Sequence, residues 1–329
     1  MRTLAIATLV SLSSILCGGA AFGQGSADSY PSKPVSLVIA SNPGGSTDGE
    51  MRLYSQRLTE ILGKPFVMDY KPGAGGTIGS RYVAKAVPDG HTLLSISTAF
   101  TTSAAFYPDP GYDAVKDFQP ISLITKRHVL MLASTKAPFK TFKEYVAYAK
   151  ANPGKVNFST TGNGASHHLI AAQMNDYLGI SVTYIHYKNS KEKQADMLSG
   201  RVDIAFNSFY TGAANARAGK QVAMVVLTND RSPLAPDWPA LTEMGIPVEL
   251  TYPAWLGMTA PARTPMPIIN KLNATLAKIA REPEVAKRFE GDSVVVIAST
   301  PAQFQQTITQ EITRWRTIAD KIGVKGEVD

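Results

Sequence analysis

Short apolar runs alternate along the chain with segments whose apolar residues recur at helical spacing. Residues 35–40 form a β-branched run that ends at Ser41-Asn42-Pro43-Gly44-Gly45, and residues 49–62 then carry a periodic apolar face that stops at Gly63. This alternation is typical of an α/β fold with mostly parallel strands. By the same criteria we expect further strands at 66–69, 92–97, 121–124, 129–133, 156–159, 182–186, 204–207, 222–227, 255–259 and 294–298. We expect helices at 49–62, 77–86, 141–151, 168–178, 192–198, 266–280, 283–289 and 301–322, the last with Thr300 as its N-cap.

The first 23 residues have the composition of a secretory signal peptide. Arg2 supplies the positive charge, residues 4–16 are an apolar core, and Ala21-Phe22-Gly23 fits a cleavage after Gly23. The core is shorter than the roughly 20 residues that span a bilayer. Lipidation of Cys17 is an alternative, but Leu16 stands where a lipoprotein signal needs a small residue. We therefore expect a cleaved signal peptide over residues 1–23 and a mature chain without cysteine.

Composition and charge narrow the function classes. The 329 residues are enough for two domains, and 33 Lys and Arg against 26 Asp and Glu give a formal net charge of +7. The basic residues are spread along the chain rather than grouped in a block, so we do not expect a nucleic-acid partner. Because Cys17 is the single cysteine, an intramolecular disulfide and a thiolate metal site are excluded.

Three glycine-rich segments each follow an expected strand and lead into an expected helix. They are Pro43-Gly-Gly-Ser-Thr-Asp48, Pro72-Gly-Ala-Gly-Gly-Thr77 and Thr160-Thr-Gly-Asn-Gly-Ala-Ser-His167. Amide N–H groups at the start of a helix, together with the positive end of its dipole, bind anions. Asp48 is the only acid in the three segments. We therefore expect these loops to bind a negatively charged ligand; the alternative is that their glycines only form tight turns.

Other chemistries find less support in the same segments. The loops match neither the Gly-x4-Gly-Lys-Ser/Thr pattern nor a strict Gly-x-Gly-x-x-Gly with a downstream acid. His167 and His168 are adjacent and lack a partner at zinc-site spacing, so we expect no metal and no cofactor. Ser166 lacks the Gly-x-Ser-x-Gly frame of a hydrolase nucleophile. We expect a binding protein and not an enzyme; an exported hydrolase using Ser166 or His167 is the alternative.

A series of motifs in a fixed order resembles one protein family. The motifs are Tyr30-Pro-Ser-Lys-Pro34, residues 43–48, residues 71–79, residues 86–94, residues 112–122, residues 151–155, Gly162-Asn-Gly164, His186-Tyr-Lys188 and Ala260-Pro261. Together they are similar to the Bug family, the extracytoplasmic solute-binding receptors of tripartite tricarboxylate transporters. The resemblance extends from about Tyr30 to the C-terminus.

The resemblance implies a fold, a location and partners. The fold is an α/β, type II-like periplasmic binding protein with two domains, mixed sheets flanked by helices, and a ligand cleft between the domains. Domain 1 would hold residues 31–127 and 256–329, and domain 2 residues 128–255. The family further implies a periplasmic monomer that binds an organic carboxylate and delivers it to inner-membrane permease subunits. Presentation of the liganded form to a sensor kinase is a second use of the same fold that the sequence does not separate from transport.

The resemblance also assigns ligand-binding roles to the three loops. The first two would bind a carboxylate through backbone donors and ordered water, and the third would face them from domain 2. The expected ligand-binding residues are Gly44, Gly45, Ser46, Thr47, Asp48, Ala74, Gly75, Gly76, Thr161, Gly162, Asn163, Gly164, Ser166, His167 and Asn207. Phe100, Phe209, Tyr210 and Tyr252 are candidates for lining the cleft, with ordinary core packing as the alternative.

Two departures from the family pattern bear on the ligand. Tyr187-Lys188-Asn189 stands where relatives often have Tyr-Lys-Gly, and Phe206-Asn207-Ser208 stands where an Asp-Asn pair often ends a strand. Losing a carboxylate near the cleft removes a like charge from an anionic ligand. A micromolar receptor needs about 8 kcal/mol, and hydrogen bonds to a charged group contribute roughly 1.5–3 kcal/mol each. Two carboxylates with two donors apiece reach that value, so we expect a dicarboxylate, and the aromatic residues favour a phthalate-type acid.

Overall fold

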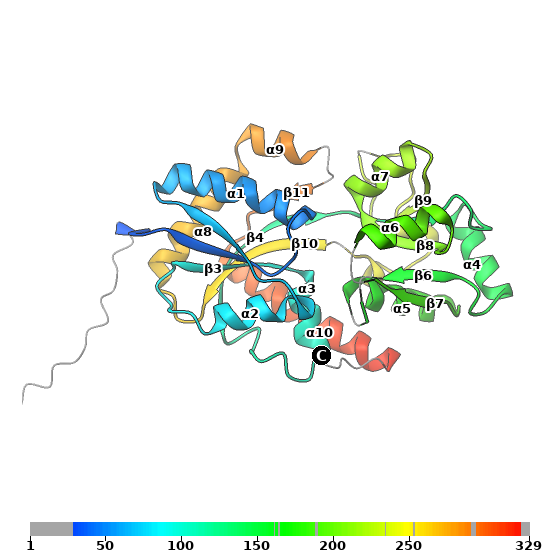
Figure 1. Ribbon diagram of the computed structural model, residues 1–329, viewed down its shortest axis with the longest axis horizontal. Coiled ribbons are helices and arrows are strands. Elements are labelled where there is room, and N and C mark those ends of the chain that lie inside the picture. The colour runs from blue at the N-terminus through cyan, green and yellow to red at the C-terminus, as the bar shows by residue number, and fades with distance from the viewer. Residues whose placement is uncertain are drawn as a thin grey trace, which may run out of the picture.

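The protein consists of two α/β lobes, each built around one sheet. The structure is a computed structural model that describes residues 29–323 except 161, 164, 188, 189, 234, 253 and 291–293. The expected signal peptide therefore lies outside the described residues. Figure 1 shows the two sheets side by side along the longest axis, with helices above and below each. Among the helices that are described, none combines the length and hydropathy needed to cross a membrane.

The first lobe is the six-stranded sheet with its helices. The strand order is β11-β4-β10-β3-β1-β2, where β1, β2 and β3 pair in parallel and β10 runs antiparallel to β3 and β4. The strands are β1 (Val35–Ile39), β2 (Phe66–Tyr70), β3 (Thr92–Ser97), β4 (Phe118–Arg127), β10 (Ala254–Pro261) and β11 (Val294–Val296). The helices are α1 (Ser46–Leu62), α2 (Thr77–Ala84), α3 (Thr98–Phe106), α8 (Met266–Ala280), α9 (Pro283–Glu290) and α10 (Pro301–Ile322).

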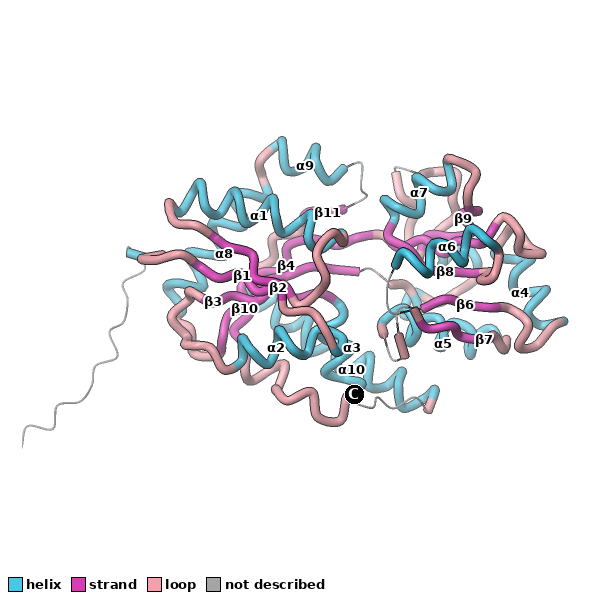
Figure 2. The backbone as a smooth tube through the Cα atoms, viewed as in Figure 1, coloured by secondary structure: helices cyan, strands magenta, loops and turns pink. Residues whose placement is uncertain are grey.

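The second lobe is the five-stranded sheet with its helices. Its order is β7-β6-β8-β5-β9, with β6 parallel to both β7 and β8 and β5 antiparallel to β8 and β9. The strands are β5 (Val129–Ser134), β6 (Asn157–Thr160), β7 (Thr183–His186), β8 (Ile204–Ser208) and β9 (Gln221–Val226). The helices are α4 (Phe142–Ala151), α5 (Ser166–Leu178), α6 (Ser190–Ser199) and α7 (Phe209–Arg217). The chain enters this lobe between β4 and β5 and returns between β9 and β10 (Figure 2).

The central strands of each sheet are buried on both faces, which explains why they are apolar runs rather than alternating ones. On β1, Val35, Leu37 and Ile39 pack in the core that includes residues of α1 and α8. Val38 points to the other face and packs in the core that includes residues of α2, α3 and α10. A sheet of this kind exposes only its ends to solvent and ligands, and the carboxyl ends of parallel strands are where α/β proteins bind ligands.

Helix α10 connects the two lobes. Near its start, Phe304 and Ile308 lie in a core of the first sheet. Near its end, Trp315 and Ile318 lie in the core of the second lobe, and Lys321 forms an ion pair of 2.8 Å with Asp176 of α5. The predicted domain boundaries, with residues 256–329 in domain 1, stay a prediction. The packing of α10 means that its last turns would contact the other domain.

Most expected elements form within a few residues of their predicted bounds, but two helices were missed. The predicted cap of α10 is confirmed, since the Gln303 amide donates to Thr300 Oγ1 at 3.2 Å. Helices α3 and α7 were not predicted. Helix α3 contains Thr98, Thr101, Thr102 and Ser103, which are weak helix formers. Their burial against neighbouring elements, and not local propensity, makes this segment helical.

Gly257 of β10 leaves room for the Phe304 ring of α10 to pack against the first sheet. A Cβ at this position would lie 2.1 Å from Phe304 Cζ. We expect Gly257→Ala to displace the Phe304 ring and to lower the free energy of unfolding by roughly 1–3 kcal/mol in urea denaturation. The control is Gly49→Ala in α1, where the new Cβ meets nothing within 4 Å. We expect this variant to have a free energy of unfolding about 0.5–1 kcal/mol higher than wild type. Equal stability of Gly257→Ala and wild type would contradict this packing.

Candidate functional site

The first glycine loop joins β1 to α1 and leaves the helix without a side-chain cap. Gly44 has φ +85°, a left-handed conformation that glycine adopts without strain. Gly45 is the N-cap, with extended φ −86° and ψ 176°, and no side chain caps the helix. The first-turn amides therefore have no acceptor within the helix. Together with the positive end of the helix dipole they offer a place for a negatively charged group.

Asp48, the acid of this loop, is occupied by internal contacts. Its carboxylate accepts hydrogen bonds from the Gly44 amide at 2.8 Å, from Arg52 Nε at 3.2 Å and from the Tyr70 hydroxyl. Burial alone would raise the pKa of Asp48, but the hydrogen bonds from Tyr70, Gly44 and Arg52 outweigh burial and lower it. Asp48 is thus a compensated anion that shapes the loop. Because it takes the Gly44 amide, the amides of residues 45–47 are the ones left to meet a ligand.

The second glycine loop follows β2 and has a backbone that few sequences permit. Gly73, Ala74, Gly75 and Gly76 all have positive φ, and Ala74 at φ +43° does so with a side chain. The loop is fixed from α3, since Ser103 Oγ donates to the Gly75 carbonyl at 3.0 Å. Gly76 is the N-cap of α2 and, like Gly45, brings no capping side chain. The Gly76 amide donates to the Gly73 carbonyl at 2.8 Å and the Thr77 amide donates to the Ala74 carbonyl. No side chain caps the other amides of the first turn of α2.

The third glycine loop follows β6 and leads into α5. Thr161 and Gly164 lie outside the described residues, so their predicted roles stay predictions. Asn163 is exposed and Gly162 half-buried. Ala165 is the N-cap of α5 without a side-chain cap. Ser166 accepts a hydrogen bond of 2.8 Å from the Tyr252 hydroxyl, which links this loop to the segment that returns to the first lobe.

His167 lies next to the hydrogen bond between Tyr252 and Ser166, and its imidazole is neutral. Its imidazole packs edge-on to Phe206 and Tyr252, with ring centroids 5.8 and 5.7 Å apart. Burial, with the positive charges of Lys193 and Arg127, lowers the pKa of His167 to about 3. The neighbouring His168 turns away and packs against Tyr184 and His186. Within the described residues no three His, Cys, Asp or Glu side chains are grouped as metal ligands.

Asn207, at the end of β8, contacts Lys193, a residue that was not predicted from the sequence. Its Oδ1 accepts a hydrogen bond of 2.7 Å from Lys193 Nζ, which also donates to the Phe206 carbonyl at 3.0 Å. Lys193 is only 5% exposed, and its burial lowers its pKa to about 8. The sequence carries no signal for this, because residues 190–199 resemble an ordinary solvated polar helix.

The elements that carry the described predicted residues have ends that face one another across the two lobes. Figure 1 shows the starts of α1 and α2 on the side of the first lobe toward the second, and β6 and α6 directed back at them. Of the four aromatic candidates, Tyr252 lies at this face through its contacts with Ser166 and His167. Phe100 and Phe209 are core residues, and Tyr210 is 59% exposed. The core-packing alternative therefore holds for Phe100 and Phe209. Tyr252 is also a buried core residue, 3% exposed.

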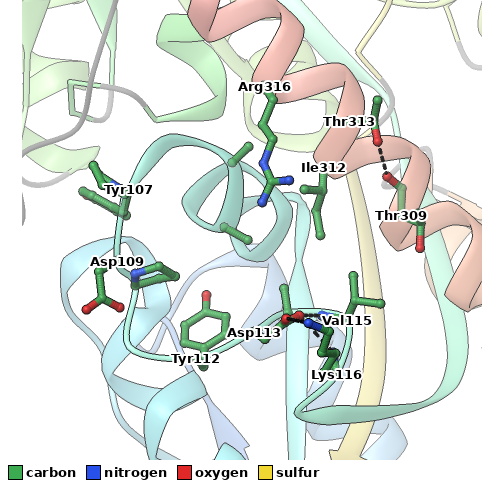
Figure 3. Close-up of a pocket in the computed structure, with 15 residues that line it drawn as sticks. Tyr107, Asp109, Tyr112, Asp113, Val115, Lys116, Thr309, Ile312, Thr313 and Arg316 are labelled. Carbon is green, nitrogen blue, oxygen red and sulfur yellow. Dashed lines mark hydrogen bonds and ion pairs between the residues drawn. The ribbon is translucent and has the colours of Figure 1, made fainter.

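A separate cavity has Tyr107 in its wall, which lies beside Gly75 of the second glycine loop. It measures about 620 Å³ and is bordered by the end of α3, residues 107–116 and α10, with Tyr112, Asp113, Lys116 and Arg316 in its wall (Figure 3). None of the predicted ligand-binding residues lines it. Its charges are of both signs, and Lys116 is already paired with Asp113 at 3.3 Å. This cavity is therefore separate from the site that the sequence predicts.

The contacts of Asp48 generate a testable pH dependence. Asp48→Asn keeps one acceptor oxygen but loses the charge that Arg52 and Tyr70 contact, so we expect unfolding free energy to fall by roughly 1–3 kcal/mol at pH 7. Since the folded-state pKa is lowered, the wild-type advantage exists above the unfolded pKa of about 3.9 and disappears as pH falls through the folded pKa. Urea denaturation across this range checks it, with exposed Asp320→Asn as control. A difference that does not change with pH would contradict this account.

Comparison with known proteins identifies the family. A family model described as the tripartite tricarboxylate transporter family receptor matches residues 51–324. BugT of Bordetella pertussis is 30% identical over 302 residues, which cover 91% of this chain and 92% of BugT.

Two solved structures share the fold. MatC from Rhodopseudomonas palustris, with bound malate, is 30% identical and superposes with a TM-score of 0.79, covering 88% of this chain and 99% of MatC. An R. palustris protein with adipate is 27% identical with a TM-score of 0.83, covering 90% of this chain and 99% of that protein. The α/β chain with its two mixed sheets therefore has the two-domain fold of periplasmic binding proteins. It belongs to the receptors of tripartite tricarboxylate transporters, the Bug family that its loop motifs resemble, and it is a solute-binding receptor and not an enzyme.

Proposed function

We propose that this receptor binds an organic dicarboxylate between its two lobes, in the periplasm, and delivers it to the permease subunits of a tripartite tricarboxylate transporter. The observation that carries the proposal is that α1, α2 and α5 each begin without a side-chain cap. Uncapped first-turn amides need an acceptor, and a carboxylate is a strong one because its hydrogen bonds are charge-assisted. The ligands named for the two solved relatives, malate and adipate, are both dicarboxylates.

The charges near the predicted site support an anion. Among the predicted ligand-binding residues that the structure describes, Asp48 is the one acid, and Arg52 already compensates it. Asn207 is neutral by nature, and His167 is neutral because its pKa is lowered to about 3. A carboxylate entering between the lobes therefore meets amide dipoles and no uncompensated like charge from these residues.

The magnitudes favour two carboxylates over one. Charge-assisted hydrogen bonds contribute roughly 1.5–3 kcal/mol each, and a helix N-terminus adds about 0.3–1 kcal/mol, or up to 2 when partly buried. Four such bonds bring a dicarboxylate into the range of about 8 kcal/mol for micromolar binding.

The proposal is tested by ligand screening together with a variant that removes one amide. We expect adipate, malate, succinate and terephthalate, screened by thermal shift, to include at least one acid that raises Tm. Ser46→Pro deletes an amide donor at the first position of α1. Proline is tolerated there, and the extended Gly45 suits the residue before a proline. We expect its Kd for that acid, measured by calorimetry, to rise by about 10- to 100-fold.

The matched control is Ser46→Ala, which keeps the amide and removes the hydroxyl. We expect it to bind like wild type. No response of wild type to any carboxylate, with a clear response to a sugar or a cation, would contradict the ligand class. Equal binding by Ser46→Pro and wild type would remove the start of α1 from the site.

A further inference from the structure

Lys193 is a buried ammonium whose charge is not balanced by the protein around it. It is 5% exposed, and both acceptors of its hydrogen bonds are neutral, the Phe206 carbonyl at 3.0 Å and Asn207 Oδ1 at 2.7 Å. In the described part of the chain no carboxylate lies within ion-pair distance of Lys193 Nζ. An ammonium has three N–H donors, so these contacts leave one N–H without an acceptor among the described residues.

The position of Lys193 makes this charge costly. It lies in the first turns of α6, where the positive end of the helix dipole disfavours a cation. A buried charge without a counter-charge is retained at a large cost in desolvation. Polar contacts within the fold offset part of this cost, and an anion from outside would offset more of it.

Lys193 also lies on the side of its lobe where the predicted site is. Its partners Phe206 and Asn207 are near the carboxyl end of β8, and its charge acts on the neighbouring His167. Figure 1 shows α6 on the part of the second lobe that faces the start of α1. Helix α6, which carries Lys193, and the starts of α1 and α2 are thus on the sides of the two lobes that face one another.

We propose that Lys193 is the specificity-determining residue of this receptor and forms an ion pair with the second carboxylate of a dicarboxylate whose first carboxylate is bound by the amides of α1 and α2. The inference rests on the proposed function and adds which residue selects two carboxylates over one. A monocarboxylate needs only the amides, whereas a dicarboxylate also compensates the buried ammonium. Asn207 has a role in this selection, because an aspartate there would pair with Lys193 and compete with the ligand.

The charged groups around Lys193 define how binding depends on pH. Glu192 and Asp196 lie on its own helix, and Asp196 accepts from the Tyr187 hydroxyl at 2.8 Å and pairs with Arg201 at 3.0 Å. From the other elements, His167 of α5 is neutral and Arg127 of β4 pairs with Glu50 at 3.4 Å. Lys193, with a pKa of about 8, is therefore the group that changes charge just above neutral pH. Dicarboxylate affinity should be constant near neutral pH, where both carboxylates are ionised, and fall above pH 8 as the ammonium loses its proton.

The experiment compares adipate with hexanoate, and terephthalate with 4-methylbenzoate, by calorimetry on wild type, Lys193→Met and Asn207→Asp. We expect Kd for the dicarboxylate that wild type binds to rise by about 10- to 100-fold in both variants. Kd for the matching monocarboxylate should change by less than about 3-fold in Lys193→Met, since no charge contact is lost. The control is Lys191→Met, which removes an exposed charge from the same helix and should leave every Kd unchanged.

A measurement on wild type alone keeps the proposal testable if Lys193→Met does not fold. The Lys193 Nζ resonance, followed by NMR in 15N-lysine-labelled protein, should titrate near pH 8 without ligand and at higher pH with adipate or terephthalate bound. An unmoved titration, or equal losses for mono- and dicarboxylates in Lys193→Met, would make Lys193 a structural residue and overturn the proposal. Wild type that binds no carboxylate at all would instead contradict the proposed function, and this inference with it.

Discussion

The start of a helix after a parallel strand is the constraint on which the rest of this structure depends. A helix without a side-chain cap has first-turn amides that no capping side chain satisfies, and α1, α2 and α5 all begin in that way. The glycines before them place the backbone in conformations that bulky residues avoid. Because the central strands of each sheet are buried on both faces, these loop ends are where the two lobes can meet a ligand.

Charge is distributed differently on the two sides of this proposed site. The first lobe offers backbone dipoles, and its acid Asp48 is held by Arg52 and by the Gly44 amide. The second lobe offers Lys193, buried and held by neutral acceptors. Dipoles bind any carboxylate, whereas a single buried cation distinguishes ligands by the number and spacing of their charges. The two lobes therefore divide affinity and selectivity between them in the account proposed here.

The architecture could largely be predicted from the sequence, since β-branched runs and glycine turns are local properties. The loop of Gly73 to Gly76 was found because its positive φ values require such residues. Helix α3 was missed because burial, and not propensity, stabilises its threonines. Asp48 was expected to contact ligand, but its partner Tyr70 lies 22 residues away. Lys193 was missed because its burial depends on β8, 13 and 14 residues further along the chain.

A crystal structure of the wild-type receptor with the dicarboxylate that raises Tm most tests the central claim most directly. The account predicts one carboxylate within about 2.7–3.2 Å of the amides that begin α1 and α2, and the other beside the Lys193 ammonium. A ligand found away from both, for example in the cavity bordered by Tyr112 and Arg316, would contradict it.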